Sequence, residues 1–243
     1  RVENSAPAVD LDGRNTTLPG TCYSTAFTEN GLLPEVAIAD TDTLIGDSDI
    51  GSTIASATIT LTNPQIGDLL TATRPLPGGI TASAYDPVTG TLTLSNVASF
   101  ADYETALEAI RFSAAGDNPV AGTRIIQVVV NDGIHDSQPA TSHITVVAVN
   151  DAPINAVPGG QSVAEDTLLP IAGVSVADID SSALTTTLSV ANGILNVTAG
   201  AGVSGNGSAS VSITGTAAQI NTALAGLAYT GNLDFNGADT LTV

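Results

Sequence analysis

The side chains with the clearest chemistry in this sequence are aspartates spaced two apart or set beside asparagine. Asp47-Ser48-Asp49 and Asp178-Ile179-Asp180 are two such pairs, and Asn150-Asp151 stands between two apolar runs. Side chains alternate along an extended segment, so an Asp-x-Asp pair directs both carboxylates to one side. Ca²⁺ takes about six to eight oxygen ligands. The pattern favours calcium sites, although such residues also form turns that cap their own backbone.

The charge of the chain fits a cationic partner. The 243 residues include 24 Asp and Glu against 5 Lys and Arg, which gives a net charge of −19 at pH 7. This excess argues against nucleic acid and against anionic membranes as partners. An acidic surface also aids solubility without any metal, and the charge alone leaves both interpretations open.

No catalytic motif accompanies the acids. Neither Gly-x-Ser-x-Gly nor His-Glu-x-x-His occurs, and neither His135 nor His143 has a nucleophile beside it in sequence. A pair of glycosidase carboxylates would need an aromatic cleft, which four Tyr, four Phe and no Trp supply poorly. Cys22 is the single cysteine, so no internal disulfide forms. We therefore expect a protein that is not an enzyme.

Composition and periodicity predict that strands position these acids. The chain is rich in Thr, Val, Ala and Ile, and 24 Gly and 12 Pro divide it into short runs. Residues 57–62 and 91–94 alternate with period two, and residues 125–130 and 142–147 flank Asn131-Asp132-Gly133 as a closing hairpin. Helical patterns cover residues 99–112, with Ser99 as the cap, and residues 218–227.

One module occurs twice. Residues 4–7 match residues 150–153, and residues 27–34 match residues 163–170. From Tyr103 matched with Ile220, the register holds without a gap to Thr123 matched with Thr240. The repeat predicts two all-β sandwich domains, residues 1–149 and 150–243, each with one short helix. The second is incomplete, because no residues match its last two strands.

The order of these motifs resembles the cadherin-like and immunoglobulin-like tandem repeats of large bacterial surface and secreted proteins, including RTX-type adhesins and biofilm-matrix proteins. The resemblance lies in Phe-Thr-Glu-Asn-Gly at 27–31, Asp-x-Asp, residues 85–94, Val-Asn-Asp-Gly at 130–133 and Val-Asn-Asp-Ala-Pro at 149–153. It implies a rod of β-sandwiches at the bacterial cell surface, Ca²⁺ at the joints, type I secretion, and a role in adhesion or biofilm. Neighbouring repeats of the same chain would then be partners.

Successive strands of a sandwich run in opposite directions, so successive loops lie at alternate ends, and this assigns each acid to one end. We expect Glu29, Asp102 or Glu104, and the connecting Asn150-Asp151 to meet Asp178 and Asp180 at one junction. A weaker cluster is expected at the other end of the first repeat, where Ser5 replaces the connecting aspartate. The predicted calcium ligands are Glu29, Glu104, Asn150, Asp151, Asp178, Asp180, Asp47, Asp49 and Asp132. Asp40 and Asp42 either add a ligand or only solvate their loop, and Glu165 and Asp166 would serve a junction to a third repeat.

Two alternatives to a calcium-stiffened stalk remain open. One is a calcium-dependent carbohydrate-binding module, because an exposed metal ion can hold vicinal hydroxyl groups of surface glycans. The other is a filament subunit that exchanges strands with other copies, because the second repeat would present an unpaired edge. Residues 1–26 are the expected donor in that case.

Overall fold

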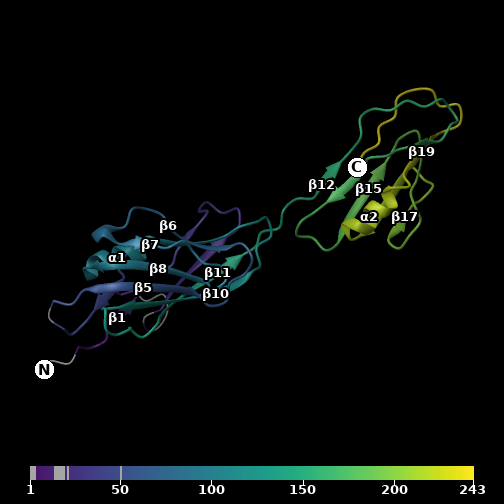
Figure 1. The fold of residues 1–243 in the computed structure, drawn as a ribbon. Coiled ribbons are helices and arrows are strands. Elements are labelled where there is room, and N and C mark those ends of the chain that lie inside the picture. Colours follow the sequence, from purple (N-terminus) through teal and green to yellow (C-terminus); the bar gives the residue numbers. More distant parts are fainter. Residues whose placement is uncertain (1–3, 14–19, 21, 50) are drawn as a thin grey trace. The chain divides into compact units, whose positions relative to one another are not determined.

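The computed structural model describes residues 4–13, 20, 22–49 and 51–243 (Figure 1). Regular structure within these residues is mostly strands, with two short α-helices and one 3₁₀ turn, so the predicted all-β class is confirmed. The chain divides into two compact units, residues 1–149 (repeat 1) and 150–243 (repeat 2), at the boundary that the sequence repeat predicts. Within the described ranges, no helix is long and apolar enough to cross a membrane.

Repeat 1 is built on a six-stranded sheet with the order β2-β11-β10-β5-β8-β7. A three-stranded sheet, β3-β9-β6, and the pair β1-β4 complete it. The elements are β1 (Ala8–Asp10), β2 (Tyr23–Thr28), β3 (Val36–Ala37), β4 (Leu44–Gly46), β5 (Ile54–Leu61), β6 (Asp68–Ala72), η1 (Pro77–Gly79), β7 (Thr81–Ala82), β8 (Thr91–Ala98), α1 (Phe100–Glu108), β9 (Ile110–Ala114), β10 (Gly122–Asn131) and β11 (Ala140–Val147).

Alternation along the strands builds the core of repeat 1. In β5, Ala57 and Ile59 are buried while Thr58 between them is exposed, as period two requires. Tyr103 of α1 and Phe112 of β9 are fully buried. The Phe112 ring meets Phe27 of β2 edge to face, with centroids 5.9 Å apart. These contacts tie the two sheets and the helix into one core.

Repeat 2 has the same plan with fewer strands and a separate core. Its sheets are β12-β14, β13-β19-β16 and β15-β18-β17. Leu188, Val211 and Ile213 of the last sheet pack with Ile220 and Leu224 of the helix. The elements are β12 (Ile154–Ala156), β13 (Leu169–Pro170), β14 (Ser175–Ala177), β15 (Leu184–Ser189), β16 (Gly193–Asn196), β17 (Val203–Ser204), β18 (Ser210–Gly215), α2 (Ala217–Leu224) and β19 (Ala228–Gly231).

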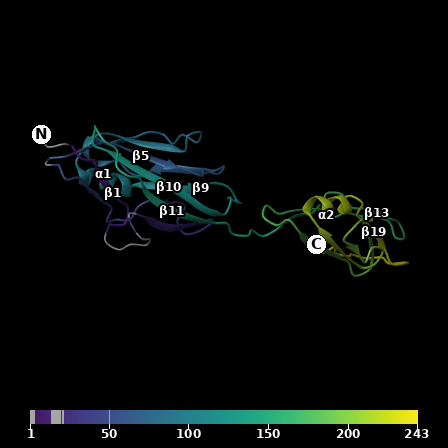
Figure 2. The ribbon, with the colours of Figure 1, turned by 90° about the horizontal axis from the view of Figure 1, so that it is seen from below.

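Both helices begin at a capping box and end earlier than their patterns predict. Ser99 and Asp102 form the box of α1, and Thr216 and Gln219 form that of α2. The predicted helix over 99–112 stops at Glu108, because Ile110 and Phe112 instead enter β9 and pair with β6. α1 contacts β4, and α2 contacts β14, which is the counterpart of β4 in the repeat. Figure 2 labels the two helices, one in each repeat.

The structure confirms the closing hairpin and shows where part of the predicted donor segment lies in repeat 1. β10 and β11 pair antiparallel on either side of the Asn131-Asp132-Gly133 turn. β2 pairs parallel with β11, and β1 pairs with β4. Residues 8–10 and 23–26 of the segment predicted as a strand donor lie in sheets of repeat 1 in this chain. Residues 1–3, 14–19 and 21 of that segment lie outside the described residues.

Candidate metal centre

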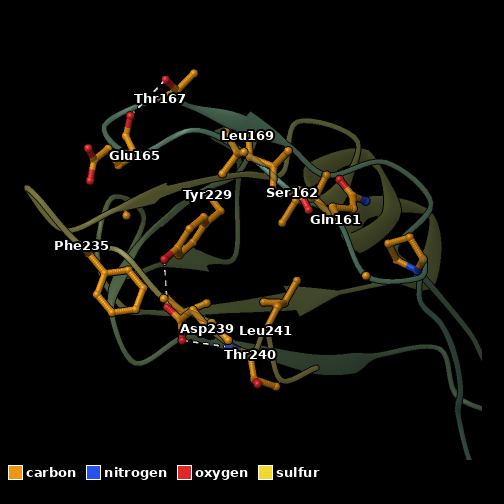
Figure 3. Close-up of a pocket in the computed structure, with 18 of the residues that line it drawn as sticks. Gln161, Ser162, Glu165, Thr167, Leu169, Tyr229, Phe235, Asp239, Thr240 and Leu241 are labelled. Atoms are coloured by element: carbon orange, nitrogen blue, oxygen red, sulfur yellow. Dashed lines mark hydrogen bonds between the residues drawn. The ribbon is translucent and has the colours of Figure 1, made fainter.

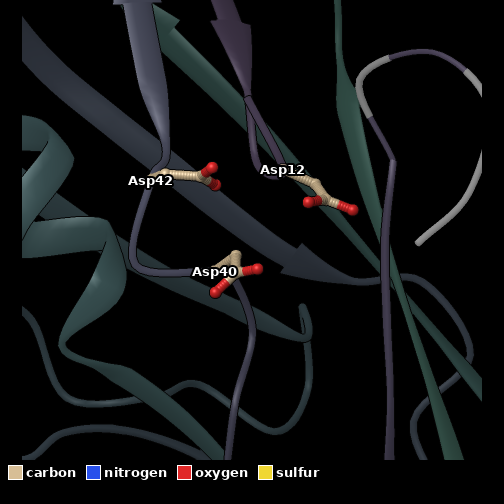
Figure 4. Close-up of side chains that lie close together, drawn as sticks. All are labelled: Asp12, Asp40 and Asp42. Carbon is tan, nitrogen blue, oxygen red and sulfur yellow. The ribbon is translucent and has the colours of Figure 1, made fainter. Parts of the chain in front are cut away.

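The tightest group of acids lies in repeat 1 and consists of Asp12, Asp40 and Asp42 (Figure 4). Asp12 follows β1, and the other two lie between β3 and β4. One carboxylate oxygen from each residue lies within 4.8 Å of the other two. It is the one such set of three or more His, Cys, Asp or Glu residues in the described part of the chain.

Backbone contacts fix the two segments that carry these acids. The Asp40 amide donates to the Leu11 carbonyl at 2.9 Å, which joins the segments directly. The Thr43 hydroxyl donates to the Asp40 carbonyl at 2.8 Å, and the Asp12 amide donates to Asp10 Oδ1 at 3.1 Å. A Cβ atom on Gly13 would lie 2.6 Å from the Asp42 carbonyl oxygen, so the close approach needs glycine.

The electrostatics of this group favour a hard cation. Asp12 is fully buried, and two carboxylates about 4.8 Å apart repel by roughly 3 kcal/mol at an effective dielectric constant of about 20. Burial raises the pKa of the nearby Glu108 carboxyl, and the positive charge of Arg74 lowers it in part. The negative charges of Glu104, Asp40 and Asp42 raise this pKa further. Carboxylate oxygens are the ligands that Ca²⁺ prefers.

The acids predicted at the start of repeat 1 surround the Asn4-Ser5 linker. The Ser5 amide donates to Asp49 Oδ2 at 2.7 Å, and the Ser5 hydroxyl donates to Asp47 Oδ1 at 2.9 Å. Asn4 forms a side-chain hydrogen bond with Asp132. Although burial alone would raise it, the pKa of Asp132 is lowered by the amides of His135 and Ile134. The linker therefore contacts Asp47, Asp49 and Asp132 together.

Repeat 2 builds the same linker contact with an aspartate in place of Ser5. The Asp151 amide donates to Asp180 Oδ2 at 2.6 Å, and the Asp180 amide donates to Asp178 Oδ1 at 3.0 Å. The Ser181 amide also donates to Asp178 Oδ1 at 2.7 Å, which is the main reason that the pKa of Asp178 is lowered. Asn150 Oδ1 accepts from the Ser181 hydroxyl at 3.4 Å.

Each linker cluster keeps buried carboxylate oxygens that no donor satisfies. Within the described residues these atoms are Asp47 Oδ2, Asp132 Oδ2, Asp178 Oδ2 and Asp180 Oδ1. A buried oxygen without a partner costs free energy unless a donor or a cation reaches it. The hydrogen bonds of these acids orient one side of each carboxylate and leave the other side for a ligand.

Glu29 is the most buried of the predicted calcium ligands, and it lies beside the end of β11. Its side chain is 4% exposed, and its Oε2 atom accepts from the Val149 amide at 2.9 Å. The Glu29 amide donates to the Val147 carbonyl at 2.9 Å, so its backbone is held as well. Its Oε1 atom is buried and receives no hydrogen bond within the described ranges.

The helix acids lie at the other end of repeat 1 from Glu29. β8 ends at Ala98, opposite Ile54, and the nearby Ser56 pairs with Asn131 of the β10–β11 turn. α1 follows β8 directly, whereas Glu29 lies beside Val147. Glu104 Oε1 accepts from the Ile45 amide at 2.8 Å, and Asp102 closes the capping box. The predicted grouping of Asp102 or Glu104 with Glu29 is therefore wrong, because β8 runs toward the end of the sandwich that carries the β10–β11 turn and α1 begins there.

Asp12 is the acid that sequence reasoning missed. The sequence offers Asp40 and Asp42 as additional ligands, but their partner Asp12 lies 28 positions before Asp40, in a short turn. The available signal was Asp10-Leu11-Asp12-Gly13, a further Asp-x-Asp followed by glycine. The predicted Glu165 and Asp166 lie in an exposed turn of repeat 2, where Asp166 Oδ1 accepts from the Asp234 amide at 3.2 Å.

Comparison with known proteins gives distant structural neighbours. No protein-family model matches the chain, and no curated protein matches it. Among solved structures, mouse cadherin-23 EC22-24 has 14% identity over 88% of this chain and 56% of its own, with a TM-score of 0.29. Human CDH23 EC21-23 has 14% identity over 87% and 54%, with a TM-score of 0.32.

A third neighbour is the human desmocollin-1 ectodomain, with 15% identity over 88% of this chain and 34% of its own, and a TM-score of 0.24. The chain spans about half the length of the two cadherin-23 structures. These neighbours are cadherin ectodomain repeats, but at such TM-scores they add nothing to the assignment of this chain. The all-β class rests on its own strands.

Proposed function

We propose that this chain is a non-enzymatic, calcium-stiffened extender of an extracellular bacterial adhesin or biofilm-matrix protein. The observation that supports this most is the repeated linker contact. In each repeat, the backbone amide of the linker residue binds the second carboxylate of an Asp-x-Asp pair, at 2.7 Å for Ser5 and 2.6 Å for Asp151. Buried oxygens of the same pairs have no donor within the described residues.

Two anchored carboxylates support a calcium ion at the connection between the repeats. Glu29 binds the Val149 amide and Asp180 binds the Asp151 amide. Two residues of extended chain span at most about 7 Å. A Ca²⁺ ion bound by Glu29, Asp178 and Asp180, with oxygens of Asn150 and Asp151, would restrain the backbone between these amides.

The group of Asp12, Asp40 and Asp42 supports a second ion inside repeat 1. These three acids come from two segments already joined by the hydrogen bond between Asp40 and Leu11. An ion there would stabilise the segments around β1 and β4 of repeat 1. It would not by itself restrain the connection, so the two ions have different effects.

The expected energies suit stiffening better than folding. Extracellular modules bind Ca²⁺ with Kd on the order of 10⁻⁴–10⁻³ M, and a tenfold excess over Kd stabilises by about 1.4 kcal/mol per site. Each repeat already has its own apolar core. We therefore expect both repeats to stay folded without calcium.

Small-angle scattering of the whole chain tests the proposal. With millimolar Ca²⁺ we expect a defined, larger maximum dimension, and with excess chelator a broader and shorter distance distribution. Circular dichroism should be almost unchanged, because the cores persist. Mg²⁺ at equal concentration controls for simple charge screening. Identical scattering profiles with Ca²⁺ and with chelator would contradict the stiffening role.

Replacing Ser5 with aspartate should strengthen calcium binding at the start of repeat 1. Ser5→Asp places another carboxylate beside Asp47 and Asp49, as Asp151 does beside Asp178 and Asp180. We expect roughly tenfold tighter binding, about 1.4 kcal/mol, at that site. Without Ca²⁺ the variant should be slightly less stable than the parent, because like charges repel. Titration calorimetry measures the first effect, and Ser5→Asn is the uncharged control of similar size.

A further inference from the structure

The six-stranded sheet of repeat 1 has one face without charged side chains, although the chain carries a net charge of −19 at pH 7. Its strands contain no Asp, Glu or Lys, and their single arginine, Arg124, is buried against Asp68. Side chains alternate between the two sides of a strand, and one side, with residues such as Val128, faces the core. We call the opposite side the neutral face. It consists of the residues of β2, β11, β10, β5 and β8 that alternate with the buried ones, such as the exposed Thr58 and Gln127.

The register of the strands joins the neutral face into rows. Val129 of β10 pairs with Thr58 of β5, which pairs with Thr93 of β8. On the other side of β10, Ile125 pairs with His143 of β11. Paired residues of neighbouring strands point to the same side of a sheet, so each row presents methyl, hydroxyl or imidazole groups and no carboxylate. The neutral face is therefore a continuous surface, rich in β-branched side chains.

Repeat 2 has the same kind of surface on the corresponding strands. By the gapless part of the sequence repeat, β18 corresponds to β8. β15 pairs with β18, with Thr187 opposite Ser212 and Ser189 opposite Ser210, and these side chains alternate with the buried Leu188. β15, β17 and β18 contain no Asp, Glu, Lys or Arg. The absence of charge is therefore a property of the module, even though acids are frequent in the loops of both repeats.

A surface of this kind fits a second copy of this chain. Two chains of the same strong negative charge repel each other, and like charges placed opposite one another at an interface cost several kcal/mol. The neutral face lets two copies touch without opposing carboxylates. Sheets also pack face to face through alternate side chains, about 10 Å apart.

The size of the neutral face predicts weak pairing. Six strands about 4.8 Å apart, and the eight residues of β5 at about 3.3 Å each, give roughly 600 Å² per copy. Two such faces bury about 1,200 Å², which is the lower end of the range for specific interfaces. Pairing through this surface is therefore expected to be reversible.

The aromatic side chains argue against an uncharged glycan as the partner. Small-molecule sites are ordinarily lined by apolar and aromatic side chains. In repeat 1, Tyr23 and Phe27 of β2 pack with the core. In repeat 2, Tyr229 and Phe235 line a pocket to which the outward residues of β15 and β18 do not contribute (Figure 3). In the described strands, the neutral face offers no aromatic ring to a sugar.

We propose that the neutral face of repeat 1 is a self-association surface, on which a second copy of this chain packs sheet against sheet. The contact is symmetric, with the same residues on both copies. It goes beyond the proposed stalk function and uses none of the calcium sites. Because salt screens the acids of the loops while the face itself is neutral, association strengthens as the salt concentration rises.

Sedimentation equilibrium of the whole chain tests the proposal, with chelator present so that calcium has no part in the result. We expect a monomer–dimer equilibrium that is at least fivefold tighter in about 0.5 M NaCl than in about 0.05 M NaCl, because the Debye length falls with salt. A chain that stays monomeric in high salt would overturn the proposal. So would a monomeric chain that dextran retards in a gel, since the partner would then be a glycan.

Charged variants locate the contact. Thr58→Glu/Gln127→Glu places two carboxylates on the neutral face and should weaken the dimer at least tenfold. The matched control, Ile66→Glu/Val88→Glu, adds the same charge at two exposed apolar residues in loops outside the six strands and should associate as the parent does. Equal weakening by both variants, or weakening by the control alone, would overturn the assignment.

A charge-swapped pair gives an independent measurement. Thr58→Lys/Gln127→Lys should associate with Thr58→Glu/Gln127→Glu at least tenfold more tightly than either variant associates with itself. The lysine variant should bind the parent chain more weakly than it binds the glutamate variant. If the lysine variant binds both equally, it recognises acidic loops and not the neutral face, and the proposal fails.

Discussion

Replacing Arg124 with methionine is expected to destabilise repeat 1 by about 3–5 kcal/mol. Arg124 Nε lies 2.6 Å from Asp68 Oδ2, and the two side chains are 3% and 1% exposed. Arg124 Nη2 also donates to the Val120 carbonyl at 2.7 Å. The Arg124→Met variant leaves the Asp68 carboxylate buried without its counter-charge, and a buried unpaired charge is among the costliest single defects in a core.

The matched control removes both charges. Asp68→Leu/Arg124→Met should recover most of the lost stability, because apolar residues of similar size often replace a buried ion pair without loss. Repeat 2 supports this expectation, since Leu241 stands where the repeat aligns Arg124, and it packs against the core of repeat 2. Urea unfolding measures both variants, with hydrogen exchange separating the two repeats. A loss below 1 kcal/mol for Arg124→Met would contradict the role assigned to the pair.

Replacing both Asp178 and Asp180 with alanine is expected to weaken calcium binding at the connection by on the order of 100-fold, about 2.7 kcal/mol. The Asp178→Ala/Asp180→Ala variant removes two carboxylates, two buried oxygens without donors, and the acceptor that holds the Asp151 amide. Titration calorimetry should show one fewer binding event. The difference in scattering between calcium and chelator should disappear as well.

The control for this variant removes the same charge elsewhere. Asp86 and Asp117 are both exposed, so Asp86→Ala/Asp117→Ala changes the net charge equally without touching the linker acids. It should keep the calcium isotherm of the parent. Equal weakening in both variants would mean that net charge, and not a defined site, attracts calcium. Retention of every binding event in Asp178→Ala/Asp180→Ala would refute the site at the connection.

Much of the local structure could be predicted because it depends on neighbouring residues. The period-two runs and the Asn131-Asp132-Gly133 turn specify the β10–β11 pair, since alternation and turn chemistry act within a few residues. Ser99 predicted the start of α1 because a capping box is a local hydrogen-bond pattern. The end of α1 was predicted too late, because pairing of Ile110 and Phe112 with β6 overrides their helical spacing.

The sequence by itself determined the all-β class, the repeated module and the Asp-x-Asp pairs, because each is written in short-range patterns. Only the tertiary structure decided which acids meet. In the structure, Asp12 is buried beside Asp40 and Asp42, and Glu104 lies at the end of repeat 1 opposite Glu29. Both outcomes depend on how many strands cross the sandwich and on which distant segments those crossings join. Pairing between distant strands is a property of the packed sheets, and no window of the sequence contains it.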